Sequence, residues 1–337
     1  MQTPPIGPTP PPTGNFMVEY SIPTIGAKPR GISHCRYNLC VTEYAASKVA
    51  ILTTTGEFFE YATPTRDAGP DLIGGGPDNN YWFTESKANK IGRLTPTGSI
   101  TEYPISTPNS VPMGIWTGDA ATRLVWFTES RSDKIASINV DTGVISEYPI
   151  PTPSSDPVSI SKDKDGSMWF VEHAANKVGT ISSTGVITEF RVPTQNSGVQ
   201  DITYVEDGNV WITEPLVGKI ARVRVPGGLI TEYRVPFAGS APAYLTEGDT
   251  VNHGYDGKNE NGKDHDDQVW FTDSGLDSVS GYNYDTSAFD APIEIPTDNA
   301  GAGNVSYGPD NNIWFIEREA NKVGVYHLPT PAPSSSP

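Results

Sequence analysis

Residues 70–104 read PDLIGGGPDNN-YWFTE-SKANK-IGRL-TPTG-SITEYP, and this stretch decides the fold. Glycine, proline, asparagine and aspartate form the turns between four short runs, at 70–73, 81–85, 91–94 and 99–104. Several of these runs are rich in aromatic and β-branched residues, which suit a pleated, half-buried surface. The stretch therefore predicts four short antiparallel strands joined by tight turns.

The aromatic–aromatic–x–acid quartet at the centre of this stretch recurs along the chain. Its acids are separated by 42, 44, 43, 42, 59 and 44 residues. Such a period, built of short strands, indicates a propeller. We therefore predict an all-β, seven-bladed β-propeller with four-stranded antiparallel blades. The quartets are Cys40-Val41-Thr42-Glu43 (a degenerate copy), Trp82-Phe83-Thr84-Glu85, Trp126-Phe127-Thr128-Glu129, Trp169-Phe170-Val171-Glu172, Trp211-Ile212-Thr213-Glu214, Trp270-Phe271-Thr272-Asp273 and Trp314-Phe315-Ile316-Glu317.

The fourth-strand phrase of each unit is missing from the last unit. Copies are found at 58–61, 99–104, 145–148, 187–190, 230–233 and 292–295, and a matching segment, FMVEYSIP, stands at 16–23. We predict that this N-terminal strand completes the seventh blade, because closing the ring removes an open interface. The propeller then spans 16–328, with an insertion at 248–268 in the sixth repeat, between proline-rich tails at 1–15 and 329–337.

Charge and hydropathy narrow the classes of partner. The net charge of −17 argues against nucleic acids and anionic membranes. No apolar run approaches the roughly 18 residues that a membrane-spanning helix needs. We expect a monomer that binds neither nucleic acid nor membranes. The charge favours cations, basic or neutral ligands, or simply solubility.

The two cysteines, Cys35 and Cys40, flank the predicted first turn of the first blade. A disulfide across this hairpin is geometrically reasonable, and a metal-binding pair is the weaker interpretation. A disulfide implies an oxidising compartment. Met1 before Gln2-Thr3-Pro4 looks like an added start codon on a mature secreted chain, so we predict a secreted, extracellular protein.

The repeat Gly-Pro-Asp-Asn-Asn-x-Trp-Phe-x-Glu, followed by Ala-Asn-Lys-x-Gly and Thr-Glu-Tyr, resembles the streptogramin B lyase (virginiamycin B lyase) family over about residues 16–328. The resemblance implies a seven-bladed propeller. In active members it also implies a magnesium-dependent elimination that opens a cyclic depsipeptide at its ester. Those members carry a Glu-Pro-His-Gly-Ile segment at the start of one inner strand. Its histidine is the base, and its glutamate holds the metal together with a quartet glutamate.

This chain departs from that pattern at the histidine position. Two residues before that position, where the first metal ligand belongs, only Asp156 is acidic. Removing a proton beside an ester carbonyl needs a positioned base. We therefore do not expect the chain to open streptogramin B. The residues at the histidine position are Arg30, Asp71, Met113, Val158, Gln200, Ala243 and Gly303.

The irregular openings of the inner strands are the first candidate site, because function tends to depart from a regular scaffold. Arg30 can bind a carboxylate or stabilise an oxyanion, and Asp71 can act as a base. The alternative is an Arg–Asp ion pair that plugs the channel. His173 directly follows a quartet acid near the same mouth, or is simply an exposed loop histidine. The candidate catalytic residues are Arg30, Asp71 and His173, and the candidate substrate contacts on the strands are Met113, Gln200 and Asn304.

Acidic residues supply two further candidates. Quartet acids that point to the channel mouth would bind a hard cation or raise one another's pKa; the alternative is that each bonds its own turn. The candidate ligands for Mg²⁺ or Ca²⁺ are Glu43, Glu85, Asp156 and Glu172. The insertion at 248–268 is rich in oxygen ligands, and it either folds around calcium or forms a flexible loop. Its His253 and His265 are candidate substrate contacts, as a lid over the mouth.

The sequence thus leaves two functions open. The first is a divergent secreted lyase-like enzyme that cleaves a C–O bond at the channel mouth, with Mg²⁺ or Ca²⁺ as the predicted cofactor. The second is a non-catalytic extracellular propeller that binds a carbohydrate, peptide or protein there. In either case the predicted ligand is a small molecule, a glycan or a peptide.

Overall fold

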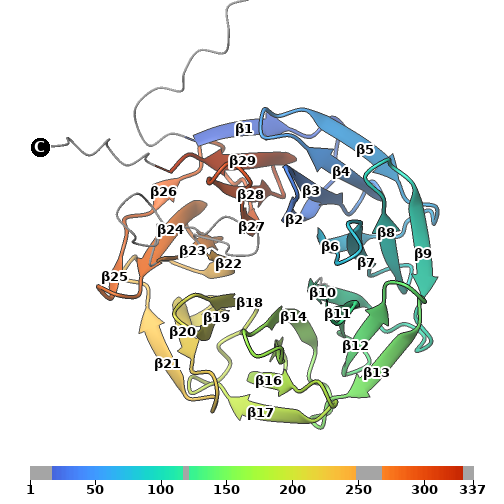
Figure 1. Cartoon of the computed structure of the whole chain (residues 1–337). Helices are drawn as coiled ribbons and strands as arrows, with labels where there is room; N and C mark the ends of the chain where they lie inside the picture. The colour runs from blue at the N-terminus through green and yellow to red at the C-terminus, as the bar shows by residue number, and fades with distance from the viewer. Residues whose placement is uncertain (1–16, 117–120, 248–267, 329–337) are drawn as a thin grey trace, which may run out of the picture.

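Seven antiparallel sheets form a ring in the computed structural model, which describes residues 17–116, 121–247 and 268–328 (Figure 1). The sheets are blades one to seven, numbered by the order of their innermost strands along the chain. The predicted all-β, seven-bladed fold is confirmed. No helix in these ranges is long and apolar enough to cross a membrane.

Blades one to four are regular. Blade one contains β2 (Pro29–Cys35), β3 (Asn38–Glu43), β4 (Lys48–Leu52) and β5 (Phe58–Ala62). Blade two contains β6 (Pro70–Gly75), β7 (Tyr81–Glu85), β8 (Lys90–Leu94) and β9 (Ile100–Pro104). Blade three contains β10 (Pro112–Trp116), β11 (Leu124–Glu129), β12 (Lys134–Asn139) and β13 (Ile145–Pro149). Blade four contains β14 (Pro157–Lys162), β15 (Met168–Glu172), β16 (Lys177–Ile181) and β17 (Ile187–Arg191).

Blades five to seven carry the departures. Blade five contains β18 (Ile202–Val205), β19 (Asn209–Glu214), β20 (Lys219–Val223) and β21 (Ile230–Arg234), with a 3-10 turn η1 (Pro215–Val217). Blade six contains β22 (Pro242–Glu247), β23 (Gln268–Asp273) and β24 (Ser278–Asn283), and its outer edge is split into β25 (Ala288–Phe289) and β26 (Ile293–Glu294). Blade seven contains β27 (Ala302–Tyr307), β28 (Ile313–Glu317), β29 (Lys322–Tyr326) and the N-terminal β1 (Met17–Ser21).

The N-terminal strand closes the ring, as predicted. β1 pairs antiparallel with β29, from Met17 opposite Tyr326 to Ser21 opposite Lys322. The innermost strands of blades seven and one are also tied, because the amide of Ile32 donates to Asn304 Oδ1 at 2.9 Å. The two ends of the chain therefore pair within blade seven, whose innermost strand is bonded to that of blade one.

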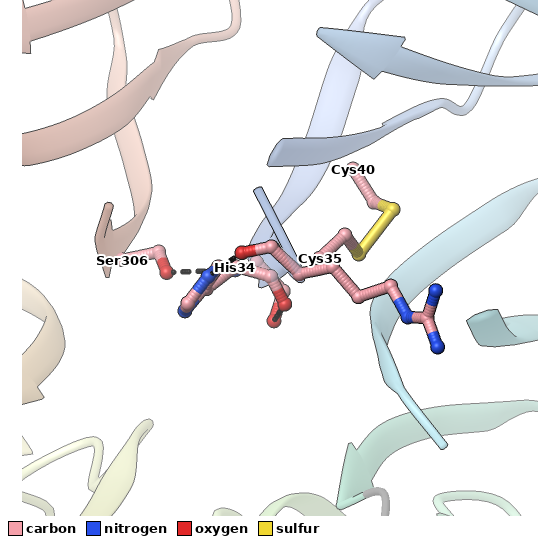
Figure 2. The surroundings of a disulfide bond; sticks show 6 residues. His34, Cys35, Cys40 and Ser306 are labelled. Atoms are coloured by element: carbon pink, nitrogen blue, oxygen red, sulfur yellow. Dashed lines mark hydrogen bonds between the residues drawn. A yellow bond between two sulfur atoms is a disulfide. The ribbon is translucent and has the colours of Figure 1, made fainter. Parts of the chain in front are cut away.

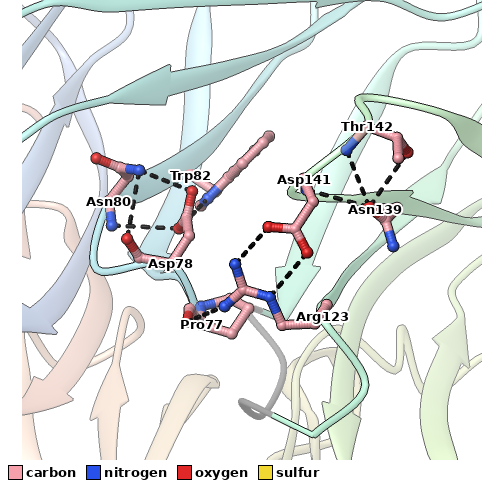
Figure 3. A network of polar contacts seen from close by, with 8 residues as sticks. All are labelled: Pro77, Asp78, Asn80, Trp82, Arg123, Asn139, Asp141 and Thr142. Carbon is pink, nitrogen blue, oxygen red and sulfur yellow. Dashed lines mark hydrogen bonds and ion pairs between the residues drawn. The ribbon is translucent and has the colours of Figure 1, made fainter.

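The quartet aromatics explain much of the repeat. The indole N–H of Trp82 donates to Asp78 Oδ1 at 2.9 Å, so the turn aspartate holds the ring (Figure 3). In the same figure Arg123 joins blades two and three, donating to the carbonyl of Pro77 at 2.6 Å while it pairs with Asp141. The turn residues of the repeat are thus selected by hydrogen bonds as well as by backbone shape.

The quartet threonine links neighbouring blades. In blade two, Thr84 Oγ1 accepts the amide of Leu72 at 3.2 Å and donates to the carbonyl of Met113 in blade three at 2.8 Å. Apolar side chains fill the rest of each junction. Ile51 of blade one, for example, packs in one cluster with Phe83 of blade two. Burial between blades, rather than in one central core, stabilises the ring.

The outer edge of blade six corrects one prediction. The phrase at 292–295 was matched to the other fourth strands, but its register is shifted by two residues. Ser278 faces Glu294 in the ladder, whereas Lys90 of blade two faces Pro104. Pro292 therefore stands where the other blades have their outer-strand glutamate. Proline has no N–H for the ladder, which is consistent with the interrupted edge.

The predicted disulfide is confirmed at the hairpin of β2 and β3 (Figure 2). Cys35 and Cys40 are bonded, with their Cα atoms 5.7 Å apart, inside the usual range for disulfides. The amide of neighbouring His34 donates to Ser306 Oγ in blade seven at 3.1 Å. The bridge lies at the end of β2 opposite to the one at which that strand begins.

Candidate functional site

A cavity of about 700 Å³ lies at the end of the ring where the innermost strands begin. It collects residues from the starts of innermost strands and from the turns that follow the quartets. Concave sites of this size, with a mixed apolar and polar lining, are typical ligand pockets. The lining residues are Asp71, Leu72, Val111, Met113, Ser130, Arg131, Asp133, Ser154, Asp156, Val158, Ser159, His173, Ala174, Gln200 and Tyr244.

Five of the residues selected from the sequence meet in this lining. They are Asp71, Met113, Asp156, His173 and Gln200. They are far apart in the chain and come from blades two to five. The structure therefore brings together most of the irregular positions singled out by comparing the repeats.

Arg30 and Asp71 form an ion pair at the edge of the cavity. Arg30 Nη1 donates to Asp71 Oδ2 at 2.7 Å, and the guanidinium stacks on the ring of Tyr44, with its Cζ 3.6 Å from the ring centroid. Burial raises the pKa of the Asp71 carboxyl, and the charge of Arg30 opposes that rise. The ion pair between Arg30 and Asp71, which the sequence offered as the alternative to a catalytic role, is present in the structure. The catalytic roles of Arg30 and Asp71 stay predictions.

His173 lines the cavity, and one of its ring nitrogens is held by the backbone. Its Nδ1 lies 2.9 Å from the carbonyl oxygen of Val199. Because a carbonyl only accepts, Nδ1 must carry the hydrogen in this contact. In the neutral ring Nε2 then keeps its lone pair. A half-buried imidazole of fixed tautomer, lining a cavity, has the geometry of a general base.

The loop before β14 is held in place by polar contacts. The carboxylate of Asp133 accepts the amides of Ser154 at 2.7 Å and Ser155 at 2.8 Å. The hydroxyl of Ser130 donates to Asp156 Oδ1. These contacts fix the rim of the cavity between blades three and four, next to His173.

The lining residue Ser159 contacts Asp201, a residue that the sequence did not reveal. Asp201 Oδ1 accepts the hydroxyl of Ser159 at 2.6 Å, and Oδ2 accepts the amide of Leu245 at 2.8 Å, which ties the innermost strands of blades four, five and six. Burial raises the pKa of Asp201 to about 6, although these hydrogen bonds oppose it. Burial also raises the pKa of nearby Tyr244. The available signal was an aspartate directly after Gln200.

The quartet acids lie within the blades, and none lines the cavity. In blade two, Lys90 Nζ binds Glu102 Oε2 and Thr65 Oγ1, both at 2.6 Å. Glu85 faces Lys90 in the ladder and is fully buried. Burial, and then the charge of Glu102, raise the pKa of Glu85 to about 8. The buried surroundings of this polar cluster thus favour the protonated form of the quartet acid.

Six blades share this cluster of quartet glutamate, lysine, outer-strand glutamate and threonine. The lysine-to-glutamate distances range from 2.5 to 3.4 Å. Glu43, Glu85 and Glu172 belong to it, so their predicted metal role at the mouth has no counterpart in the cavity lining and stays a prediction. The members are Glu43, Lys48, Glu60 and Thr24; Glu85, Lys90, Glu102 and Thr65; Glu129, Lys134, Glu147 and Thr107; Glu172, Lys177, Glu189 and Thr152; Glu214, Lys219, Glu232 and Thr194; and Glu317, Lys322, Glu19 and Thr297.

The acids in the lining do not assemble a site for a hard cation. Asp71 pairs with Arg30, Asp133 accepts loop amides, and Asp156 accepts the hydroxyl of Ser130. In the described part of the chain, no group of three or more His, Cys, Asp or Glu side chains has the geometry of a metal site. The donor set therefore does not fit Mg²⁺ or Ca²⁺, and the cofactor stays a prediction on which no chemical step below depends.

Asn304, a predicted substrate contact, is not part of the cavity lining. Asn304 accepts the amide of Ile32 and thereby joins blades seven and one. His253 and His265 lie outside the described residues, as does almost all of the insertion proposed to bind calcium. Their predicted roles are not tested by this structure.

Comparison with known proteins agrees with the fold and the repeat. The model of the virginiamycin B lyase family matches residues 11–253. A streptogramin B lyase structure is 30% identical, with a TM-score of 0.82 over 93% of this chain and 98% of that one. Among curated protein sequences, none matches the chain significantly.

A second solved structure is a catalytically inactive variant of virginiamycin B lyase from Staphylococcus aureus with quinupristin. It is also 30% identical, with a TM-score of 0.82 over 94% of this chain and all of that one. The Kuenenia stuttgartiensis hydrazine synthase structure, at 14% identity and a TM-score of 0.72, shares the fold alone. The family model covers well over half of the chain, and the repeat that carries the match is the one that builds the blades. The chain belongs to the virginiamycin B lyase family.

Proposed function

We propose that the chain is a divergent lyase-like enzyme that cleaves a C–O bond of a small ester in the mouth cavity, with His173 as the base. In this reaction Nε2 takes the proton from the carbon next to a carbonyl. The electron pair of that C–H bond forms a C=C bond, and the C–O bond at the next carbon breaks. The oxygen leaves as a carboxylate, so no water is consumed.

The observation that carries this proposal is the fixed tautomer of His173. The carbonyl of Val199 holds Nδ1–H at 2.9 Å, and the ring lines the cavity. A positioned general base contributes typically 10²- to 10⁴-fold to a rate. This histidine comes from the turn after β15 and not from the start of an innermost strand. The base is therefore proposed at a new position on the shared scaffold.

Other lining residues have supporting roles in this proposal. Arg131 lines the cavity and makes no ion pair within the residues that the structure describes, so its guanidinium is free to bind the departing carboxylate. Tyr244 has a raised pKa because it is buried, and its protonated hydroxyl is a hydrogen-bond donor for the substrate carbonyl.

We propose an extracellular location for the chain. The disulfide between Cys35 and Cys40 needs an oxidising compartment to form and persist. Propellers of similar fold are the extracellular domains of two Bacteroides thetaiotaomicron proteins, although at 12% and 14% identity they share only the fold. A thiol assay on protein recovered from the medium, with and without reductant, tests both points.

The test is an elimination assay on O-acyl serine and O-acyl threonine derivatives, with quinupristin as a comparison. The product absorbs in the ultraviolet because its new double bond is conjugated with the carbonyl. We expect turnover by the wild type and a loss of about 100-fold or more in His173→Gln. His327→Gln is the matched control, since His327 does not line the cavity. Equal turnover by wild type and His173→Gln would contradict the role of this base.

The alternative function is a non-catalytic propeller that binds a carbohydrate, peptide or protein at the same mouth. It is favoured by the family's histidine position, where the cavity presents Asp71, Met113, Val158 and Gln200 and no histidine. Product formation separates the two functions. We expect no ring opening of quinupristin under either function, and saturable binding of any panel member without product would favour the alternative.

A further inference from the structure

The residue that stands at the entry to the innermost strand is glycine in some blades and carries a side chain in others. In blades two, three, four and seven, the residue just before the innermost strand adopts a left-handed conformation, and its carbonyl accepts the amide of the residue after the quartet. In blade two that residue is Gly69, with φ of 61°, and its carbonyl accepts the amide of Ser86 at 3.0 Å. Blades five and seven also have glycine, at Gly198 and Gly301, both with φ of 69°.

Blades one, three and four place side chains at this glycine-like position. Lys28 has φ of 49°, and Val111 and Asp156 both have φ of 52°. A β-branched residue with positive φ is a genuine outlier, and aspartate is tolerated better than valine. The fold does not require these side chains, because glycine makes the same turn in other blades. Strain of this kind clusters at ligand sites.

Two of these three left-handed residues, Val111 and Asp156, line the same cavity. Val111 and Asp156 are both in its lining, from blades three and four. Lys28 is not in the lining, and its ammonium pairs with Glu319 on blade seven. Val111 and Asp156 therefore add side chains to the cavity lining at a position where other blades have glycine.

The cavity has an apolar wall beside Val111. Leu72, Met113 and Val158 line it as well, and they belong to the starts of β6, β10 and β14. These three strands are the innermost strands of neighbouring blades, so their side chains form one continuous side of the cavity. An aromatic or aliphatic group of a ligand is the natural occupant of that side.

Charge distinguishes the rim next to this wall. The carboxylate of Asp156 accepts the hydroxyl of Ser130 and makes no ion pair with any cation in the described residues. Asp71 is neutralised by Arg30, which leaves Arg131 as the cation of the lining. The net charge of the chain, −17, makes the surrounding potential negative. A cationic group is therefore favoured near Asp156.

We propose that Val111 and Asp156 are specificity-determining residues, which make the cavity prefer ligands that carry an amine next to an apolar group. Val111 extends the apolar wall, and Asp156 pairs with the amine. The inference rests on the proposed function because it concerns the same cavity, but it makes a claim about binding rather than about turnover.

The test measures binding of two small probes by NMR titration of the whole chain. Phenethylamine and phenylacetate share a ring and differ in charge, and we expect the amine to bind more tightly. Asp156→Asn should weaken phenethylamine binding by about fivefold, the value of a partly exposed ion pair, without weakening phenylacetate. Val111→Gly should weaken both probes to a similar extent. Lys28→Gly has the same backbone strain outside the cavity and should change neither.

A thermal melt shows whether these variants act through folding. We expect Val111→Gly to melt no lower than the wild type, because glycine relieves the left-handed strain. Equal affinity for the two probes, no binding of either, or unchanged binding in both cavity variants would overturn the inference. Amine preference without turnover of any ester would contradict only the proposed enzyme, and turnover without amine preference would contradict only this inference.

Discussion

Blades two and six solve the same packing problem with different residues. Blade two has Thr65, Lys90, Glu102 and buried Glu85 in one polar cluster. The corresponding positions in blade six are Phe237, Ser278, Pro292 and Asp273. All four residues have changed together, and the carboxylate of Asp273 instead accepts the amides at 241 and 275, at 2.8 and 3.0 Å.

This joint replacement shows that the cluster works as a unit. A buried ammonium or carboxylate is stable only with its partners, so losing one member favours losing the others. The quartet acid is therefore a residue of the scaffold in both blades. The positions that vary without such compensation, among them Val111, Asp156 and His173, are those that line the cavity.

The largest effect is expected from a single cluster residue placed in the wrong blade. Ser278→Lys puts an ammonium at a fully buried position that lacks the outer glutamate and the threonine. We expect the free energy of unfolding to fall by about 3 kcal/mol or more, measured by denaturant melts. Adding Phe237→Thr and Pro292→Glu should recover part of that loss. An unchanged melt for the single variant would show that the cluster is not a unit.

A smaller loss is expected when the cluster of blade two is broken. Glu102→Ala removes the partner of Lys90 and Thr65, and we expect about 2 kcal/mol of destabilisation. Glu294→Ala is the matched control, because Glu294 is exposed on the outer edge of blade six and outside any such cluster. Its effect should stay within about 0.5 kcal/mol. Equal losses from both variants would remove the distinction between the blades.

The smallest effect is a change in pH dependence. The pKa of Glu85 is about 8 in the folded chain, against an ordinary value of 4.5. Between these values the unfolded chain binds fewer protons, so the free energy of unfolding falls as the pH rises. The melting temperature should therefore decline from pH 5 to pH 8. Glu85→Gln should make this decline shallower, by about a sixth if the six clusters contribute equally.

The outer-strand glutamates give the opposite trend at lower pH. Burial works to raise the pKa of Glu102, but hydrogen bonds from Lys90 and Thr65 hold it below its ordinary value. Its contribution to stability is present above the unfolded pKa and is lost as the pH falls through the folded one. A melting temperature that rises steadily from pH 5 to pH 8 would contradict the protonation states assigned to the clusters.

The sequence predicted the ring because the repeat is dominated by local rules. Turn residues, alternation and the copy at 16–23 define the strands, the closure and the hairpin disulfide. The role of Glu85 was not predictable, because spacing places its backbone but not its neighbours from β8 and β9. Glu294 was wrongly aligned with the outer-strand glutamates of the other blades. A shift of two residues leaves the alternation of side chains between the two faces of a strand unchanged, so the pattern did not reveal it.

The cavity was predictable only in part. Asp71, Met113, Asp156, His173 and Gln200 were found because they depart from the repeat at the ends of strands. Ser159 and Tyr244 lie further along innermost strands, where residues vary for packing reasons as well, and Asp201 lies just before β18. Their importance follows from contacts between blades four, five and six, and a single repeat carries no information on such contacts.

The central claim is that the irregular mouth, and not the regular quartet acid, carries the function. The most direct test is turnover of the O-acyl serine and threonine panel by wild type, Glu85→Gln and His173→Gln, each checked for folding by its melt. We predict product from the wild type and Glu85→Gln, and almost none from His173→Gln. No product from the wild type, or loss of turnover in folded Glu85→Gln with full turnover in His173→Gln, would contradict the account.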